Sequence, residues 1–346
     1  MTETTLLQEI DNIIAQIKEI PASRNYWLIR TQSGEFYDSF RQHKFVAIEH
    51  EQISLYEVNK ILEKNGKDTK AALKELKSLS QKKYPDDRFG LIAGQVMKFV
   101  AELKKGDIVI IPSSNSEIIS IGEITSSTIP ELTQAELLKT ECPYKKRKPV
   151  KWIKDIPRDS LDPFLYRMLQ AHQAINNITR YSDIVERTIG NFYIKGGEAN
   201  LVLEVQQNDD INARQLFGLG WHLLDYSQDF FDKLKLELSV DEIEVKINLN
   251  SKGKIQFKAP NARTLWLIAL LTVAVNGGGL KIDVKGFNLD LSTDGIIKKV
   301  IDYQNNKHDR EKVDTLMKNM DSLQIKSPDD AVKMFQQFST NKNNPK

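Results

Sequence analysis

Apolar residues near the N-terminus recur every three or four positions, which is the spacing of one face of an α-helix. Across residues 4–19 this face carries six aliphatic side chains: Leu6, Leu7, Ile10, Ile13, Ile14 and Ile17. Pro21 follows, and proline ends a helix because it has no backbone N–H to donate. We therefore predict an amphipathic helix over residues 4–19.

The next part of the chain alternates short β-branched and aromatic runs with longer helical patterns. Strands are predicted at residues 25–30, 45–48, 107–112, 118–125 and 150–153. Helical spacing over 54–80 and 88–102 separates the second strand from the third, and 162–176 has the same spacing. This order predicts a small set of strands with a helical insertion.

The second half repeats a different pattern, in which strands come in hairpins with helices between them. Strands are predicted at residues 200–206, 242–248, 254–258, 280–284 and 287–291, and helices at 211–238 and 261–275, with three more helices near the end. Hairpins favour an antiparallel α+β layer over a parallel sheet. A chain of 346 residues favours two domains. We predict them at 1–180 and 190–338, with a disordered tail at 339–346.

Composition limits the location and the partners of the chain. With 49 basic and 47 acidic residues the net charge is only +2, so a nucleic-acid surface would have to be a local patch. The single cysteine, Cys142, excludes an internal disulfide and a cysteine-built zinc site. The N-terminal segment is unlike a signal peptide, and the apolar run 265–275 is shorter than the roughly 20 residues of a membrane span. We expect a cytoplasmic protein without a membrane span.

Three segments carry a resemblance to a known family. They are NYWLIRTQSGEFYDSFRQHKFVAIE, GDIVIIPSSNSEIISIGEIT and CPYKKRKPVKWIKDIPRDSLD. Their order resembles the PUA/EVE-like N-terminal module of Mrr-like restriction-system proteins, in which a proline-ended strand precedes an IGE strand, a basic segment, a V-x-W strand and I/V-P-R. The likeness spans residues 24–175. It implies an α+β fold, with a small PUA/EVE-like β-barrel before the antiparallel α+β domain.

The same resemblance implies a function. PUA-superfamily barrels typically bind RNA or DNA, and their EVE and YTH relatives hold a single modified base in an aromatic pocket. We therefore expect a nucleic-acid recognition protein of a prokaryotic defence or restriction-type system, whose second half assembles or signals.

The densest positive cluster of the chain lies inside the resemblance. Cations neutralise phosphates, and an aromatic face stacks on an unpaired base. The predicted nucleic-acid-binding residues are Lys145, Lys146, Arg147, Lys148, Lys151, Trp152 and Arg158. The alternative is a solvated loop before a strand, with Trp152 in the core.

Aromatic residues gather between positions 27 and 45 and are followed by an acid. In a small barrel such residues can line a base pocket, where a carboxylate reads the hydrogen-bonding edge of the base. The predicted pocket residues are Trp27, Phe40, Phe45 and Glu49. The alternative is that these rings are core, because aromatics dominate the packing of small barrels.

Two other function classes stay open. Mrr-like enzymes continue into a PD-(D/E)xK nuclease, but residues 204–207 (EVQQ) lack its lysine, and the acid-x-lysine runs 244–246 and 283–285 also fit a solvated strand face. A Mg²⁺-dependent nuclease is therefore one alternative. A nucleotide-signal sensor that forms a homo-oligomer through its long helices is the other. The five histidines lack metal-binding spacing, and no cofactor or resident metal is predicted.

Overall fold

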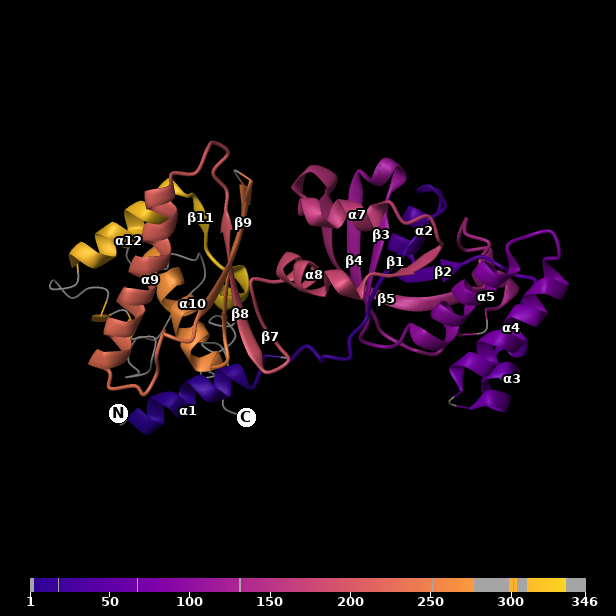
Figure 1. The fold of residues 1–346 in the computed structure, drawn as a ribbon, viewed down its shortest axis with the longest axis horizontal. Helices are drawn as coiled ribbons and strands as arrows, with labels where there is room; N and C mark the ends of the chain where they lie inside the picture. Colours follow the sequence, from indigo (N-terminus) through magenta and orange to yellow (C-terminus); the bar gives the residue numbers. More distant parts are fainter. Residues whose placement is uncertain are drawn as a thin grey trace. The chain divides into compact units, whose positions relative to one another are not determined.

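The computed structural model describes residues 3–17, 19–66, 68–130, 132–250, 252–276, 299–300, 302–303 and 310–333. The chain forms two compact units, one of residues 23–189 and one that joins residues 1–22 to 190–346 (Figure 1). Each unit is described by itself. The mixed α+β class expected from the sequence is confirmed.

The unit of residues 23–189 is built on a six-stranded sheet in the order β2-β5-β4-β3-β1-β6. The β1–β3 pair is parallel and the other pairs are antiparallel. The strands are β1 (Tyr26–Ile29), β2 (Phe45–Ile48), β3 (Ile108–Pro112), β4 (Ile118–Ile124), β5 (Lys146–Pro157) and β6 (Ile175–Asn177). Strand β5 is long enough to pair with β2 at its beginning and with β4 along the rest, which curls the sheet.

Helices cover both faces of this sheet. They are α2 (Tyr37–Gln42), α3 (Leu55–Asn65), α4 (Thr69–Lys83), α5 (Phe89–Met97), α6 (Gln134–Leu137), α7 (Tyr166–Leu169) and α8 (Ser182–Ile189). Successive residues of β1 point to opposite faces of the sheet and pack in different hydrophobic cores. Trp27 packs with α3–α5 on one face, and Tyr26 packs with α7 and α8 on the other. The central strands are therefore apolar on both sides, which explains their unbroken hydrophobic runs.

Two expectations for this unit differ from the structure. The described strand pairings end at β2 and β6, so they form an open, curled sheet where a barrel was expected. The predicted helix 162–176 is replaced by the short α7 and by β6, because its apolar residues pack against the second face of the sheet.

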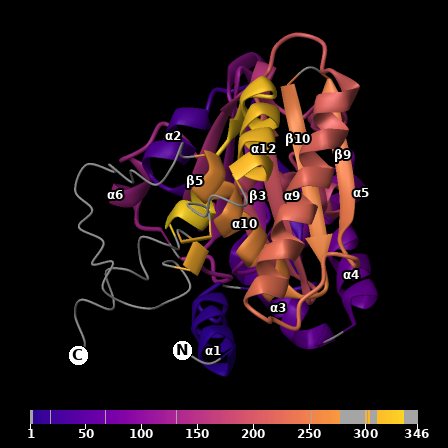
Figure 2. The same ribbon diagram turned by 90° about the vertical axis from the view of Figure 1, so that its left-hand side faces the viewer.

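The other unit contains an antiparallel sheet in the order β11-β8-β10-β9, with β7 also paired to β8. Its strands are β7 (Phe192–Lys195), β8 (Glu198–Val205), β9 (Glu244–Asn250), β10 (Lys252–Ala259) and β11 (Ile325–Lys326). Its helices are α1 (Glu3–Ile14), α9 (Ala213–Lys233), α10 (Ala262–Asn276) and α12 (Arg310–Ser322). Figure 2 shows α9 and α12 side by side in front of β9 and β10.

The N-terminal helix belongs to this second unit, whereas the sequence-based boundary placed it in the first. Leu6 and Ile10 of α1 are buried in the same core as α10. Arg263 of α10 also binds Asp11 with two hydrogen bonds of 2.6 and 2.7 Å. An amphipathic helix packs on whichever apolar surface of the fold is uncovered, and the order of elements in the sequence does not specify which surface that is.

Helix α10 is buried almost throughout, as its apolar run indicated. In the part of the chain that the structure describes, no helix combines the length and the apolar character needed to cross a membrane. The predicted strands 280–284 and 287–291 and the tail 339–346 lie outside the described residues.

Candidate functional site

Three of the predicted phosphate-binding cations are buried at the start of β5. Lys146, Arg147 and Lys148 are only 2%, 6% and 0% exposed. The ammonium group of Lys148 donates to the carbonyl oxygens of Leu103 and, at 3.3 Å, Val100. Burial lowers the pKa of Lys148 to about 8. These three residues therefore do not form the cationic surface that was expected.

Lys146 and Arg147 hold the adjoining backbone. Lys146 Nζ donates to the carbonyl of His50 at 3.0 Å and lies 3.4 Å from the carboxylate of Glu51. The Arg147 guanidinium donates to the carbonyls of Cys142 and Tyr144 at 2.6 and 2.7 Å. These bonds connect β5 to the loop that follows β2 and to the loop that precedes β5. They also give the carbonyl groups a donor, and a buried carbonyl without a donor would destabilise the fold.

The other predicted cations lie at the surface. Lys145, Lys151 and Arg158 are exposed. Trp152 is half-buried, donates from Nε1 to the carbonyl of Phe40 at 3.2 Å and carries the Arg41 guanidinium 4.9 Å from its ring centre. Lys145, Lys151 and Arg158 are therefore the members of the predicted set that remain open to a phosphate.

The aromatic residues of the predicted base pocket are core. Trp27, Phe40 and Phe45 are buried in the cluster beneath α3–α5. Trp27 Nε1 donates to the Asp107 carboxylate at 3.0 Å. These rings fill the interior, so they leave no slot for a base. Glu49, the fourth predicted pocket residue, is exposed.

Glu49 lines a cavity of about 490 Å³ within the same unit. The walls come from the ends of β1 and β2, from α5, and from the loops before β5 and β6. The lining residues are Arg30, Gln32, Ser33, Ala47, Ile48, Glu49, Leu91, Gln95, Tyr144, His172 and Ala174. The volume is within the range of roughly 300–1,000 Å³ that is usual for small-molecule sites.

The backbone around this cavity adopts conformations that side chains normally avoid. Gln32 and Ser33 have φ values of 51° and 56°, in the turn that follows β1. His50, beside Glu49 at the end of β2, has a φ of 77°. Left-handed conformations of non-glycine residues cost energy and are concentrated at functional sites. Gln32 and Ser33 line the cavity and His50 follows the lining residue Glu49, so these positions support the choice of this cavity as the candidate site.

Polar side chains of the cavity lining are held in place by other contacts. Arg30 is held by its Nε, which donates to the carbonyl of Ala171 at 2.9 Å, and by a second bond to the carbonyl of Leu169. The Nε2 of His50 is 2.9 Å from Oε1 of Gln95 and 3.8 Å from the Glu49 carboxylate. The cavity lining thus combines one guanidinium and one carboxylate with the amides of Gln32 and Gln95 and the imidazole of His172.

Tyr144 adds an aromatic wall. Its ring packs edge-on against Phe36, with ring centres 5.1 Å apart. Burial, and to a lesser extent the charge of Glu49, raises the pKa of Tyr144 to about 12, so the phenol stays neutral at physiological pH. Arg30, Gln95 and Tyr144 were not predicted as pocket residues. Tyr144 borders the basic run in the sequence, but Gln95 lies in an apolar helix with no distinguishing signal.

The acid-x-lysine residues of the other unit lie on a strand, as expected. Glu244 and Lys246 are two positions apart on β9 and therefore share one face, opposite Lys258 and Gln256 of β10. Among the described residues, no group of three or more His, Cys, Asp or Glu could hold a metal ion. The second run, 283–285, lies outside the described residues.

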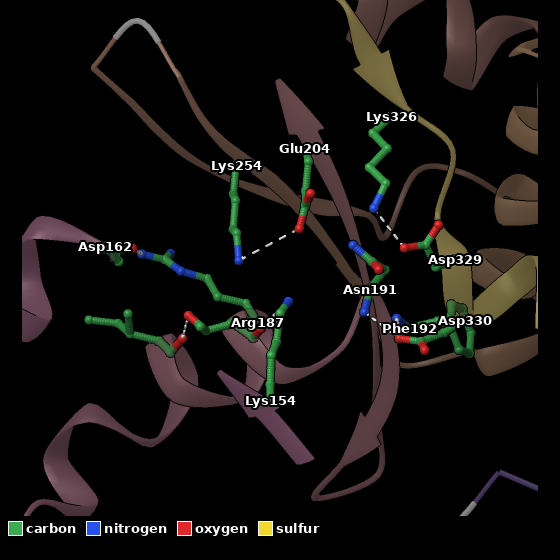
Figure 3. A network of polar contacts seen from close by, with 12 residues as sticks. Lys154, Asp162, Arg187, Asn191, Phe192, Glu204, Lys254, Lys326, Asp329 and Asp330 are labelled. Atoms are coloured by element: carbon green, nitrogen blue, oxygen red, sulfur yellow. Dashed lines mark hydrogen bonds and ion pairs between the residues drawn. The ribbon is translucent and has the colours of Figure 1, made fainter. Parts of the chain in front are cut away.

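Several other charged side chains of this unit form ion pairs or hydrogen bonds (Figure 3). Lys254 lies 4.0 Å from Glu204, and Lys326 lies 2.7 Å from Asp329. The carboxylate of Asp330 accepts the backbone N–H of Asn191 at 2.5 Å. In the unit of residues 23–189, the same figure shows Arg187 bound to Asp162 at 2.5 Å. These contacts explain the charges as structural pairs.

The comparison with protein families gives one match. Residues 27–177, less than half of the chain, are similar to a domain of unknown function, DUF8426. The matched part lies within the unit of residues 23–189 and contains the cavity. No curated protein matches the chain. No solved structure matches it either.

Proposed function

We propose that residues 23–189 form a PUA/EVE-like module that recognises nucleic acid by holding one flat base in the cavity beside Glu49. The module would serve a prokaryotic defence or restriction-type protein, as the resemblance of its sequence motifs implies. The observation that carries the proposal is the cavity itself, which has a suitable size and is lined by Arg30, Glu49 and Gln95.

The charges of the cavity favour a base over a phosphate. Arg30 and Glu49 carry opposite charges, so together they add no net charge. A phosphate would be repelled by the carboxylate, whereas the edge of a base presents both donors and acceptors. Glu49 accepts from an amino or imino group of the base, and Arg30 and Gln95 donate to its ring nitrogens or carbonyl oxygens.

The remaining walls suit the faces of a flat ring. Ile48 and Leu91 supply apolar contacts, and Tyr144 supplies an aromatic one. Stacking on an aromatic ring contributes about 1–3 kcal/mol for each base. The exposed Lys145 follows Tyr144 in the chain and would contact the phosphate next to the bound base.

Fluorescence anisotropy of labelled single- and double-stranded DNA and RNA, with and without modified bases, tests the proposal. We expect single strands to bind and the affinity to fall as salt rises from about 50 to about 200 mM. Glu49→Gln should weaken binding by about 1 kcal/mol, because the charged acceptor becomes a neutral amide oxygen and its bond to the base is weaker. Glu63→Gln on α3, an exposed residue outside the cavity, is the matched control.

Calorimetry with free nucleosides and nucleotides separates a nucleic-acid reader from a nucleotide sensor. A reader binds the polymer far more tightly than the monomer, because neighbouring phosphates contribute. If no nucleic acid, nucleoside or nucleotide binds, or if Glu49→Gln and Glu63→Gln bind equally well, the proposal is wrong.

A further inference from the structure

Helix α9 exposes two large aromatic rings one turn apart. Phe217 is 67% exposed and Trp221 is 71% exposed. The opposite side of the helix is already occupied, because Leu219, Leu223 and Phe230 are buried in the core. Contiguous apolar surface of this kind marks interaction sites on soluble proteins.

The same helical spacing continues beyond the two rings, to the exposed Arg214 on one side and to the half-buried Leu224 and Gln228 on the other. Arg214, Phe217, Trp221, Leu224 and Gln228 follow one another at alternating intervals of three and four residues. This is the spacing of the seam through which one helix packs against another. The seam is short, with a cation at its N-terminal end and a polar amide at its C-terminal end.

We propose that this seam pairs with α9 of a second copy of the chain, with the two helices antiparallel. Charge decides the direction. Arg214 stands near the beginning of α9, and Asp225 and Asp232 stand in its second half. An antiparallel pair sets each Arg214 against the acidic half of the other helix, whereas a parallel pair would set like charges together.

The register follows from the same residues. With the two-fold axis beside position 219, Phe217 of each copy packs on Trp221 of the other, and Arg214 reaches the other copy's Asp225. A side chain built at Gly220 would meet nothing within 4 Å, so the surface beside the two rings is open. Lys312 of α12 lies 2.9 Å from the Asp225 carboxylate and also binds Asp229, so these three groups keep a net negative charge beside the seam.

The area of the seam sets the strength of the contact. A Phe or Trp ring buries roughly 150–250 Å² when fully covered, so the two rings offer about 300 Å² in each copy. About 600 Å² in total is less than the roughly 1,200 Å² of a stable complex. The self-association is therefore reversible and depends on protein concentration.

Sedimentation velocity of the full chain from about 5 to about 200 µM tests the inference. We expect the weight-average sedimentation coefficient to rise toward that of a dimer. The double variant Phe217→Ser/Trp221→Ser should stay monomeric. Tyr56→Ser, which removes an aromatic ring that is 73% exposed on α3, should behave like the unchanged chain.

Charge reversal tests the antiparallel direction. Arg214→Glu and Asp225→Lys should each weaken self-association at least about tenfold. An equimolar mixture of the two variants should recover it, because each salt bridge re-forms between unlike copies. Circular dichroism of both variants verifies that α9 is intact, so a failure to fold is distinguished from a failure to pair.

Three results would overturn the inference: a monomer at every concentration, a dimer that survives the double substitution, or a mixture that does not recover. A monomer whose tryptophan emission shifts to the blue on phosphatidylcholine vesicles, with no shift in the double variant, would assign the seam to a membrane surface. None of these results bears on base binding by residues 23–189.

Discussion

Replacing Lys148 by methionine probes the most deeply buried cation of the 23–189 unit. Methionine keeps a similar length and apolar stem but removes the ammonium group and its bonds to the carbonyls of Val100 and Leu103. At neutral pH the substitution has two opposed effects. It leaves two carbonyls without a donor, and it also removes a charge that burial penalises. The informative quantity is therefore the change in stability with pH.

The magnitude follows from the pKa of Lys148. Burial lowers it from the ordinary 10.5 to about 8 in the folded chain. This fall corresponds to about 3 kcal/mol. Because the folded pKa lies below the unfolded one, the penalty is complete below pH 8 and disappears as pH rises through 10.5. Between about pH 7 and about pH 9.5 this one group should increase the free energy of unfolding by about 2 kcal/mol.

Pulse proteolysis across a urea series, read by peptides from β2 and β5, measures the stability of this unit in the full chain. The free energy of unfolding of the unchanged chain minus that of Lys148→Met should rise by about 2 kcal/mol from about pH 7 to about pH 9.5. Lys151→Met removes an exposed lysine from the same strand and serves as the control, since its ammonium group is hydrated before and after unfolding. A constant difference between Lys148→Met and the unchanged chain would refute the reasoning.

Four further outcomes are expected. Phe45→Ala should destabilise the 23–189 unit by about 3–5 kcal/mol in the same proteolysis assay, because the ring is core and does not line the cavity. Ile10→Ala should cost about 2–5 kcal/mol and lower hydrogen-exchange protection in α10 but not in β3, because α1 packs in the second unit. Lys146→Met should weaken base binding by about 1 kcal/mol in the anisotropy assay without touching the ligand, since it releases the His50 carbonyl. Lys145→Ala should reduce the salt slope of binding by about 1.

Much of the fold could be predicted because the elements follow local rules. Helical spacing from residue 54 predicted a helix, and α3 begins there with a capping box of Ser54 and Glu57. The hairpin of β3 and β4 and the apolar helix α10 also form as predicted. Strand β6 was missed, since three residues are too few to show a period. The partner of α1 was misassigned because amphipathicity shows that a face is buried and does not show against what.

The candidate site was less accessible to the sequence, for a physical reason. A pattern of charged and aromatic residues indicates which interactions the side chains can make, but it does not indicate whether those side chains are buried. Trp27 and Phe45 look the same in the sequence whether they line a pocket or fill a core. Burial depends on how β5 passes from β2 to β4, which is a long-range property. Glu49 was predicted as the acid that follows the aromatic cluster, and it lines the cavity although the predicted rings do not.

The buried cations connect the basic sequence motif to the cavity. An ammonium group removed from water is a poor source of stability, so its retention calls for another role. Lys146 donates to the carbonyl of His50, and the His50 ring lies beside Glu49 and Gln95. Arg147 anchors the loop that carries Tyr144. The basic run thus shapes two walls of the cavity from behind, and this accounts for a dense positive cluster whose central members are hidden from any phosphate.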